Sequence, residues 1–502
     1  MYTFATPLDR ALRTVPDNCA VGCEGRRASY AEFARRCRKL AGALYGLGLK
    51  RGDRVGVVSL NSDRYLELYL TVPAAGLVLV PVNSRLAPAE MQAILTDAGV
   101  SVVFTDADYP GAAETARVLS LPGDYEDLLD RAPERALGDG VAEDDVAVLF
   151  YTSGTTGVAK GAIHTHRSLV SSGLHFMATW PFDSQTRWLV ASPMFHTGGT
   201  IAMLATVWAG GTHVIMPGFR PDLALDLIEA EAITHTLLVP TMLAAAVTEQ
   251  EARPRDIGSL RYLSHGASPI TTETLRRAHA AFPGAELLHV YGTTETTPIA
   301  TLGRHEELII GTPLDRSCGQ PAVGVEIRIV DKAGQEVPAG RVGEIIIRSP
   351  SVMAGYWNKP IETREAIVDG WYRSGDLGYQ DQHGYLFLVD RAKDMIVSGG
   401  ENIYSTEVEN ALASHPSVAE AAVFGVPDER WGEAVFAIVV TRLGVTQDEL
   451  MLHCRDHIAG FKVPKTIELR TDPLPKSAAG KVLKRELREP HWAGRPAKVA
   501  GS

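Results

Sequence analysis

The stretch YTSGTTGVAKGAIHTH, residues 151–166, combines glycines, hydroxyl side chains and a lysine directly after the apolar run VAVLF. Glycine lets backbone N–H groups approach a ligand closely, Ser and Thr add donors, and lysine adds positive charge, so the mixture suits a polyphosphate. The spacing is not that of a Walker A loop, which needs Gly, four residues and then Gly-Lys-Ser/Thr, because Lys160 follows Ala159 and precedes Gly161. A surface turn made of small residues is the alternative that this stretch alone leaves open.

Three later stretches also gather residue types that bind and react. HVYGTTETT, residues 289–297, places an aromatic residue, a glycine, hydroxyls and the acid Glu295 at the end of a predicted strand. GWYRSGDLGY isolates the acid Asp376, and LPKSAAGKVLKREL places Lys481 in a glycine-punctuated basic tail. Because the four stretches are far apart in the sequence, their chemistry depends on the elements that position them.

Helical and strand-like patterns alternate from about residue 28 onward. SYAEFARRCRKLAGALYGLGL repeats apolar residues at helical spacing, RVGVVSL is a short β-branched run, and AEMQAILTDAGV followed by SVVFTD repeats the pair. This alternation predicts an α/β fold with a mostly parallel sheet, in which ligands gather at the ends of strands.

After about residue 320 the pattern changes to short β runs with turn signals, and the last hundred residues have an α+β pattern of their own. Thr406 with Glu409, and Thr446 with Glu449, predict two helices that begin with capping boxes. We therefore predict a large N-terminal domain over residues 1–390, a charged hinge at 391–394 (RAKD) and a small α+β domain over 395–502.

Composition and charge exclude several classes of protein. A chain of 502 residues with 45% hydrophobic and 22% charged residues is typical of a globular protein with two or more domains. The formal net charge of -11 argues against general nucleic-acid binding, so an anionic ligand needs a local basic patch. The five cysteines form no CxxC pair and no zinc spacing, which favours a reducing compartment. The N-terminus lacks a signal-peptide pattern and the apolar stretches are short, so we expect a cytoplasmic protein.

Together and in this order, the four stretches closely resemble the motifs of the adenylate-forming superfamily of acyl-CoA synthetases, adenylation domains and luciferases, from about residue 28 to residue 488. The resemblance implies a large multi-layer α/β domain followed by a small mobile α+β domain. It also implies two reactions: a carboxylate attacks ATP to give an acyl-adenylate and pyrophosphate, and the thiol of coenzyme A then displaces AMP. ATP, Mg²⁺ and coenzyme A are thus the implied cofactors and co-substrates, the other partner is a small carboxylic acid, and a homodimer is left open.

The resemblance also assigns the ATP site. The residues implied to hold the β- and γ-phosphates are Thr152, Ser153, Gly154, Thr155, Thr156, Gly157 and Lys160. Glu295 matches a magnesium carboxylate, a hard oxygen ligand, and Thr294 matches a hydroxyl that contacts the α-phosphate. The residues implied to surround adenine are Tyr291, in a motif shared with Gly292 and Thr293, and the small residues Gly266 and Ala267. Asp376 and Arg391 match the ligands of the ribose hydroxyls.

The second domain supplies the remaining implied groups. Lys481 matches the lysine that bridges the acyl carboxylate and the α-phosphate during adenylation, and Lys393 occupies the hinge position. Gly399 and Gly400 match the loop that lines the pantetheine tunnel.

A local basic patch for the coenzyme A nucleotide is also present in the sequence. From Arg455 to Arg488 there are nine Lys or Arg residues against four acids. Trp431, Lys462 and Lys465 align with residues that some relatives use for the nucleotide, whereas Val463 stands where one group of relatives has arginine. A solvated basic face is the alternative for Lys462.

The implied acyl pocket lies beside SPMFHTGG, with LLVPTML and SHGASP as its other walls. Phe195 and His196 match a recurrent aromatic–histidine pair near the substrate carboxylate, which makes His196 a candidate catalytic residue. The other predicted lining residues are Gly198, Gly199, Met203, Val239, Met242 and His265. Since these segments place no Arg or Lys to hold a second carboxylate, malonate is disfavoured and a fatty or aromatic acid is expected.

Other readings of the same motifs remain. A stand-alone adenylation enzyme that charges a carrier protein would share the first reaction, and so would a luciferase-like monooxygenase. A catalytically silent nucleotide-binding regulator belongs to a different class, and the intact Lys481, Glu295 and phosphate loop argue against it.

Overall fold

The computed structural model describes residues 2–106, 116–152, 159–268, 270–304, 310–399, 401–428, 430–441, 444–476 and 482–493. The chain divides into two compact units, of which the first comprises Met1–Ile327 and Ile347–Arg373 and the second Arg328–Ile346 and Ser374–Ser502. Three strands each begin in one unit and end in the other: β16 (Glu326–Val330), β17 (Gly343–Arg348) and β20 (Trp371–Gln380). Residues 391–394 lie inside the second unit, and both their role as a hinge and the predicted domain limits remain predictions.

Nine strands of the first unit form one sheet, in the order β15-β14-β13-β12-β11-β9-β10-β1-β2. The six central strands are parallel and the edge strands are antiparallel. In chain order these strands are β1 (Cys19–Cys23), β2 (Arg26–Ser29), β9 (Arg187–Val190), β10 (Thr212–Ile215), β11 (His235–Leu237), β12 (Tyr262–Gly266), β13 (Glu286–Tyr291), β14 (Thr301–Arg304) and β15 (Gln320–Pro321).

A second sheet of the first unit has the order β18-β8-β7-β4-β3-β5-β6 and is also mostly parallel. Its strands are β3 (Arg54–Val58), β4 (Val78–Pro81), β5 (Val100–Thr105), β6 (Arg117–Ser120), β7 (Val146–Thr152), β8 (Lys160–Thr165) and β18 (Gly355–Tyr356). The prediction of an α/β fold with a mostly parallel sheet is confirmed. Parallel strands are buried on both faces, which explains why their sequences, such as VAVLF in β7, are continuously apolar.

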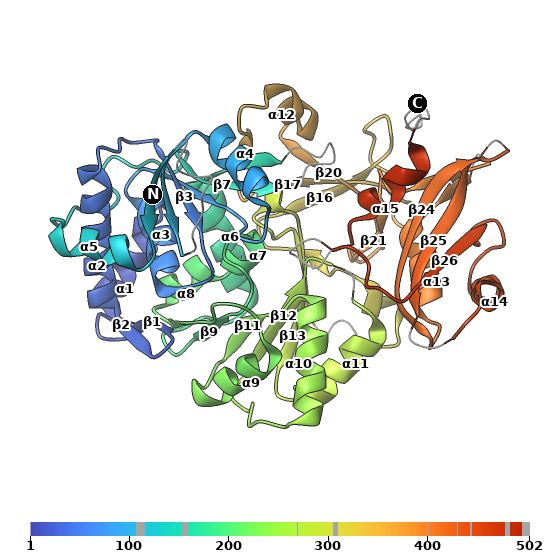
Figure 1. Ribbon diagram of the computed structural model, residues 1–502, viewed down its shortest axis with the longest axis horizontal. Coiled ribbons are helices and arrows are strands. Elements are labelled where there is room, and N and C mark those ends of the chain that lie inside the picture. Colours follow the sequence, from blue (N-terminus) through green and yellow to red (C-terminus); the bar gives the residue numbers. More distant parts are fainter. Residues whose placement is uncertain are drawn as a thin grey trace. The chain divides into compact units, whose positions relative to one another are not determined.

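Helices cover both sheets (Figure 1). They are α1 (Ala5–Thr14), α2 (Tyr30–Gly46), α3 (Asp63–Ala74), α4 (Pro88–Ala98), α5 (Gly123–Arg131), α6 (His166–Thr179), α7 (Thr197–Thr200), α8 (Met203–Ala209), α9 (Pro221–Ala230), α10 (Pro240–Ala252), α11 (Thr272–Ala281) and α12 (Pro360–Ala366). The largest sheet packs against α9, α10 and α11 through apolar residues such as Leu225, Val247 and Ala278, which meet Leu263 and Leu287 of the strands. The side chain of Ser29 caps α2 by accepting a hydrogen bond from the Glu32 N–H.

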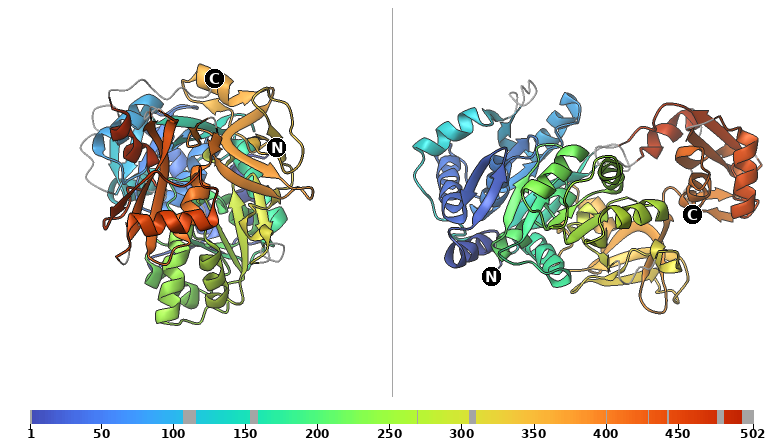
Figure 2. Two further views of the ribbon diagram at one scale, coloured as in Figure 1. Left: turned by 90° about the vertical axis from the view of Figure 1, so that its right-hand side faces the viewer. Right: turned by 90° about the horizontal axis from the view of Figure 1, so that it is seen from below.

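The second unit contains a sheet with the order β23-β22-β25-β24, with β26 beside β25. Its elements are β21 (Leu386–Arg391), β22 (Ile396–Ser398), β23 (Glu401–Ile403), α13 (Ser405–Ala413), β24 (Val418–Asp428), β25 (Gly432–Thr441), α14 (Gln447–His457), β26 (Thr466–Arg470) and α15 (Lys484–Trp492). Alternate residues of β24 and β25 face two different layers: Val423 and Val435 pack against α13 and α14, and Phe424 and Phe436 pack against α15. Figure 2 shows α15 lying along β24.

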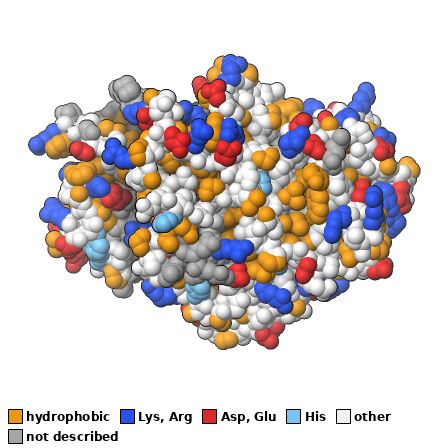
Figure 3. All heavy atoms as spheres, turned by 180° about the vertical axis from the view of Figure 1, so that it is seen from behind, with side chains coloured by type: hydrophobic (Ala, Val, Ile, Leu, Met, Phe, Trp, Pro, Cys, Tyr) orange, Lys and Arg blue, Asp and Glu red, His pale blue; other side chains and the backbone are white. Residues whose placement is uncertain are grey.

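The charges on the surface and the composition of the helices concern two classes considered above, nucleic-acid-binding proteins and membrane-spanning proteins. On the face drawn in Figure 3, Lys and Arg side chains are interspersed with Asp and Glu. In the part of the chain that the structure describes, no helix has both the length and the apolar composition needed to cross a bilayer.

Candidate active site

The predicted phosphate loop connects two antiparallel strands. Strands β7 and β8 form a hairpin whose last pair before the loop is Thr152 with Lys160. A Walker A loop instead leads from a strand into a helix, so the hairpin agrees with the spacing argument against that motif. Five of the predicted phosphate-binding residues lie outside the described residues: Ser153, Gly154, Thr155, Thr156 and Gly157.

The second predicted stretch forms a tight turn at the end of β13. Tyr291 is the last residue of the strand, and a Cβ atom on Gly292 would lie 1.8 Å from the Pro298 carbonyl oxygen, so only glycine fits there. The Thr293 N–H donates to the Thr296 Oγ1 at 2.9 Å, and the short 3₁₀ helix η2 (Thr294–Thr296) follows. This turn places the polar residues Thr294–Thr296, which include Glu295, directly after the carboxyl end of a parallel strand.

The neighbouring strand β12 ends beside this turn. Its residue Gly266 pairs with Val290, and a Cβ atom at Gly266 would lie 2.1 Å from the Val290 carbonyl oxygen. Ala267 follows with a φ of 69°, a left-handed conformation that is uncommon for a residue with a side chain. The predicted adenine-site residues Gly266, Ala267 and Tyr291 therefore lie at the ends of two adjacent strands.

Tyr356 is a residue of this site that the sequence analysis missed. Strand β18 pairs with β8 and thereby brings Tyr356 to the phosphate hairpin. The Tyr356 hydroxyl donates to the Glu295 Oε1 at 2.8 Å, and the Lys160 Nζ lies 5.3 Å from the centre of the Tyr356 ring. Burial and the adjacent Glu295 carboxylate raise the pKa of Tyr356, so the hydroxyl keeps its proton. The only signal in the sequence was the pair of aromatic residues after a glycine in GYWN. Tyr356 of this pair is 61 residues from Glu295, so no short-range pattern predicts their contact.

Glu295 fits the role of a magnesium ligand. Glu295 is only 9% exposed, and its carboxylate accepts a hydrogen bond from the Tyr356 hydroxyl. Among the residues that the structure describes, no cluster of three or more His, Cys, Asp or Glu could hold a metal ion by itself. Mg²⁺ bound with a nucleotide typically uses one or two carboxylates, phosphate oxygens and water, so a single well-placed acid is sufficient for it.

The predicted acyl-site residues lie in three regions of the first unit: around α7 and the start of α8, at the start of α10, and at the end of β12. The Phe195 and His196 rings pack edge to face with their centres 4.7 Å apart, and His196 immediately precedes α7. His265 of β12 lies against His289 of β13, with ring centres 4.9 Å apart. Burial lowers the pKa of His289 to about 4, so that imidazole is neutral at physiological pH.

The apolar members of this predicted set differ in exposure. Met203, the first residue of α8, is fully buried. Val239 and Met242 flank the start of α10 and are partly buried, and the Ser192 hydroxyl lies 4.0 Å from the Met242 sulfur. That these residues line an acyl pocket remains a prediction.

The two adjacent glycines of SPMFHTGG are expected to respond differently to substitution. A Cβ atom on Gly199 would lie 2.0 Å from the Pro193 carbonyl oxygen, whereas one on Gly198 would meet no heavy atom within 4 Å. We expect Gly199→Ala to lower the free energy of unfolding by about 1–3 kcal/mol, because the backbone must shift. Gly198→Ala should change it by less than about 0.5 kcal/mol. Urea denaturation of both variants measures the difference, and equal effects would contradict this placement of the two residues.

In the second unit, the structure brings Asp376 and Arg391 together; their binding of the ribose remains a prediction. They are directly opposite each other on β20 and β21, and the Arg391 Nε lies 3.1 Å from the Asp376 Oδ1. Asp376 is only 5% exposed, so the guanidinium compensates its buried charge. Lys393 follows two residues later at the surface.

The predicted coenzyme A residues occupy varied environments in this unit. A Cβ atom on Gly399 would lie 2.8 Å from the Trp431 ring, which is 39% exposed, so the absence of a side chain there lets the indole lie on the loop. Lys462 is ion-paired with Glu407 of α13 at 2.7 Å, and Lys465 is exposed. Val463 belongs to the hydrophobic core of the unit. Gly400 and Lys481 lie outside the described residues.

A buried charge cluster connects the end of β21 with the start of α15. Asp390 accepts hydrogen bonds from the backbone N–H and the hydroxyl of Ser405, the first residue of α13, and thereby caps that helix from a distant strand. The Lys484 Nζ donates to the Ser405 Oγ at 2.8 Å and lies 2.7 Å from the Glu409 Oε1. The predicted capping box of Thr406 and Glu409 is therefore wrong, because Glu409 is engaged by Lys484 and Asp390 supplies the cap.

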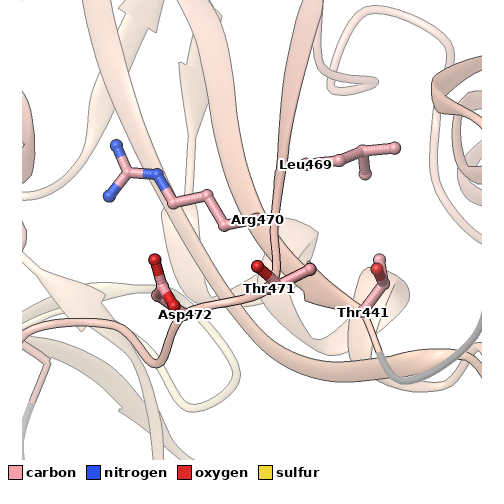
Figure 4. A pocket seen from close by; sticks show the side chains of 5 residues that line it. All are labelled: Thr441, Leu469, Arg470, Thr471 and Asp472. Carbon is pink, nitrogen blue, oxygen red and sulfur yellow. The ribbon is translucent and has the colours of Figure 1, made fainter.

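A surface hollow of about 460 Å³ lies at the ends of β25 and β26 in the second unit. Figure 4 shows the Arg470 and Asp472 side chains on the same side of the end of β26. The hollow is lined by Thr441, Leu469, Arg470, Thr471 and Asp472; Arg470 and Asp472 lie in the basic segment 455–488, but none of the five is an individually predicted site residue. It therefore adds nothing to the candidate site.

Two family models match the chain: "AMP-binding enzyme" over residues 8–357 and "AMP-binding enzyme C-terminal domain" over residues 407–481. A feruloyl-CoA synthase from Amycolatopsis sp is 39% identical over 491 residues, which cover 96% of this chain and 97% of the relative. The fatty acid–[acyl-carrier-protein] ligase ScoC from Streptomyces coeruleorubidus is 37% identical over 503 residues, or 96% of this chain and 95% of the relative. The structure of o-succinylbenzoate coenzyme A synthetase from Bacillus subtilis in complex with ATP and magnesium ion matches with a TM-score of 0.87 and 29% identity, over 96% of this chain and 98% of that one.

Proposed function

The chain belongs to the family of AMP-binding enzymes, and from that premise we propose that it activates a fatty or aromatic carboxylic acid with ATP and transfers the acyl group to coenzyme A. It is an acid–thiol ligase of the AMP-forming, acyl-CoA synthetase type. The observation that carries the choice of acid is the full-length similarity to a feruloyl-CoA synthase, accompanied by similarity to a fatty-acid ligase.

The proposed reaction has two steps. In the first, an oxygen of the substrate carboxylate attacks the α-phosphorus of ATP, and the bond to the bridging oxygen breaks, which gives acyl-adenylate and pyrophosphate. In the second, the thiolate of coenzyme A attacks the acyl carbon and AMP leaves with the former carboxylate oxygen. Both steps bring anions together, so positioning and charge neutralisation must supply most of the acceleration.

The residues of the first unit are proposed to bind the nucleotide and the acid. The hydroxyls and N–H groups of the hairpin loop, with Lys160, would bind the β- and γ-phosphates, and Thr294 the α-phosphate. Glu295 would hold Mg²⁺, which when bound neutralises phosphate charge. The left-handed Ala267 and the ring of Tyr291 would lie against adenine, and the region around Phe195, His196 and Gly198 would hold the acyl group.

The residues of the second unit are proposed to act in turn. Asp376 would accept hydrogen bonds from the ribose hydroxyls, with Arg391 beside it. Lys481 would neutralise charge on the α-phosphate during adenylation. Rotation about the predicted hinge at Lys393 would then exchange Lys481 for the loop around Gly399, which would let pantetheine reach the acyl-adenylate.

A carrier protein is the second candidate for the thiol acceptor, because ScoC is named for an acyl-carrier-protein substrate. Lys462 forms an ion pair with Glu407, so one of the cations predicted for the coenzyme A nucleotide already has an acidic partner. We favour coenzyme A because most of the similar ligases are named for it. A cytoplasmic location and a homodimer remain predictions.

The function is tested with a panel of acids that includes short, medium and long fatty acids, benzoates, cinnamates and malonate. Each is incubated with ATP, Mg²⁺ and either coenzyme A or an acyl-carrier protein carrying phosphopantetheine, and both pyrophosphate and thioester are measured. We expect one class of monocarboxylate to give both products with coenzyme A. Pyrophosphate with thioester only on the carrier protein would favour the second candidate, and no pyrophosphate with any acid would favour a silent regulator.

A further inference from the structure

Residues 351–356 support the turn that carries Glu295. The Ser351 carbonyl oxygen accepts from the Thr297 Oγ1 at 3.0 Å, and the Met353 N–H donates to the Glu295 carbonyl oxygen at 2.8 Å. Two residues later, the strand pairing of β18 with β8 fixes the backbone of Tyr356. The segment therefore holds both the backbone and the side chain of Glu295, although 61 residues separate Glu295 from Tyr356.

The contact with Tyr356 engages only one oxygen of the Glu295 carboxylate. The phenol donates to Oε1 at 2.8 Å, and in the described ranges Oε2 accepts no hydrogen bond. A carboxylate whose one oxygen is held by a fixed donor keeps the lone pairs of the other oxygen in a set direction, which is how neighbouring hydrogen bonds orient metal ligands in proteins. The geometry thus leaves one oxygen of Glu295 suited to a hard divalent cation.

The face of the same ring contacts a cation of the phosphate hairpin. The Lys160 Nζ lies 5.3 Å from the ring centre, within the range of a cation–π interaction. Among the described residues, Lys160 and Glu295 form no ion pair with each other. Tyr356 contacts the Lys160 ammonium with its ring and the Glu295 carboxylate with its hydroxyl. The two charged groups are therefore held apart, and each can bind a ligand.

We propose that Tyr356 is a positioning residue for the first reaction: its hydroxyl orients Glu295 toward the divalent cation of the metal–ATP complex, and its ring holds Lys160 toward the phosphates. This inference rests on the proposed function, since it needs Glu295 to be the carboxylate that holds the cation. Tyr356 itself contacts neither the acid substrate nor the thiol in this assignment.

Tyr356→Phe removes the hydroxyl and keeps the ring, so it tests the first half of the proposal. Calorimetric titration of Mn²⁺ into the ATP-saturated, full-length protein should show an affinity reduced by about 10-fold or more, the usual effect of removing a group that orients a metal ligand. Pyrophosphate release should need a correspondingly higher Mg²⁺ concentration, and the KM for the acid should not change. An unchanged Mn²⁺ affinity overturns the role of the hydroxyl.

Tyr30→Phe is the matched control. The Tyr30 hydroxyl is fully buried and donates to the Gly211 carbonyl oxygen at 2.7 Å, and neither residue belongs to the predicted site. Its loss removes a comparable hydrogen bond and lowers stability, but it should leave Mn²⁺ binding unchanged. If Tyr30→Phe weakened Mn²⁺ binding as much as Tyr356→Phe, the effect of Tyr356 would be one of stability and the proposal would fail.

Tyr356→Leu tests the ring. Without the ring, the affinity for ATP measured in EDTA should fall relative to Tyr356→Phe, because Lys160 loses its support. Equal metal-free ATP affinities in the two variants would remove the ring from the proposal. If the wild-type protein released no pyrophosphate with any acid, the proposed function would fail, whereas normal pyrophosphate release with unaltered metal dependence in Tyr356→Phe would reject this inference alone.

Discussion

Lys481→Ala is expected to lower the rate of acyl-adenylate formation by roughly 10²–10³-fold, the usual cost of removing one charged or hydrogen-bonding group from a pre-organised site. The reason is that the substrate carboxylate and the α-phosphate are both anionic and need a cation between them in the transition state. Transfer of the acyl group from supplied acyl-adenylate to coenzyme A should keep its rate, because the proposed rotation removes Lys481 before that step. Pyrophosphate exchange measures the first reaction and thioester formation from synthetic acyl-adenylate measures the second.

Lys476→Ala provides the control for this variant. Lys476 lies on the same basic segment and forms an ion pair with Glu420 at 2.6 Å, with its side chain 31% exposed. Loss of such a partly exposed pair typically costs at most about 1 kcal/mol of stability and should leave acyl-adenylate formation unchanged. An equal loss of both reactions in Lys481→Ala would contradict the assigned role.

Glu295→Gln is expected to reduce pyrophosphate exchange by on the order of 10²–10³-fold and to raise the Mg²⁺ concentration that gives half of the maximal rate. Glutamine keeps the size of the side chain and an oxygen that accepts from the Tyr356 hydroxyl, so the turn should remain folded while the negative charge is lost. The measurement is exchange of pyrophosphate as a function of Mg²⁺ at saturating ATP.

Glu251→Gln on α10 is the matched substitution at a distance from the site. Its carboxylate pairs with Arg277 at the surface, where both side chains are about half exposed. The exchange rate and the Mg²⁺ dependence should equal those of the wild type. If Glu295→Gln retained normal Mg²⁺ dependence, the metal would have to be held by other groups.

The fold was predictable from the sequence where its causes are local. Continuous apolar runs indicated buried parallel strands, and the Thr446–Glu449 capping box begins α14 as predicted. The corresponding prediction at Thr406 failed because the local hydrogen bond competes with a buried carboxylate from another strand. Asp390 of β21 accepts from the Ser405 N–H at the start of α13, and Lys484 engages Glu409.

In the candidate site, too, the features with local causes could be predicted from the sequence, and those that depend on contacts between distant segments could not. The sequence predicted that the residues proposed to bind the nucleotide follow β7, β12 and β13, because their glycines and hydroxyls come directly after apolar runs. Asp376 and Arg391 pair across two strands, as their shared assignment to the ribose implies. Tyr356 was missed because its contact with Glu295 results from the pairing of β18 with β8, and no spacing pattern in the sequence records that pairing.

The hairpin that carries the phosphate loop has a consequence for engineering. The antiparallel ladder through Thr152 and Lys160 fixes both ends of residues 153–159, so the register of the sheet does not depend on what lies between them. Each doubling of such a loop costs only about 0.6 kcal/mol of closure entropy. A peptide epitope inserted there should therefore leave the sheet folded while removing ligase activity, because it displaces the predicted phosphate-binding residues.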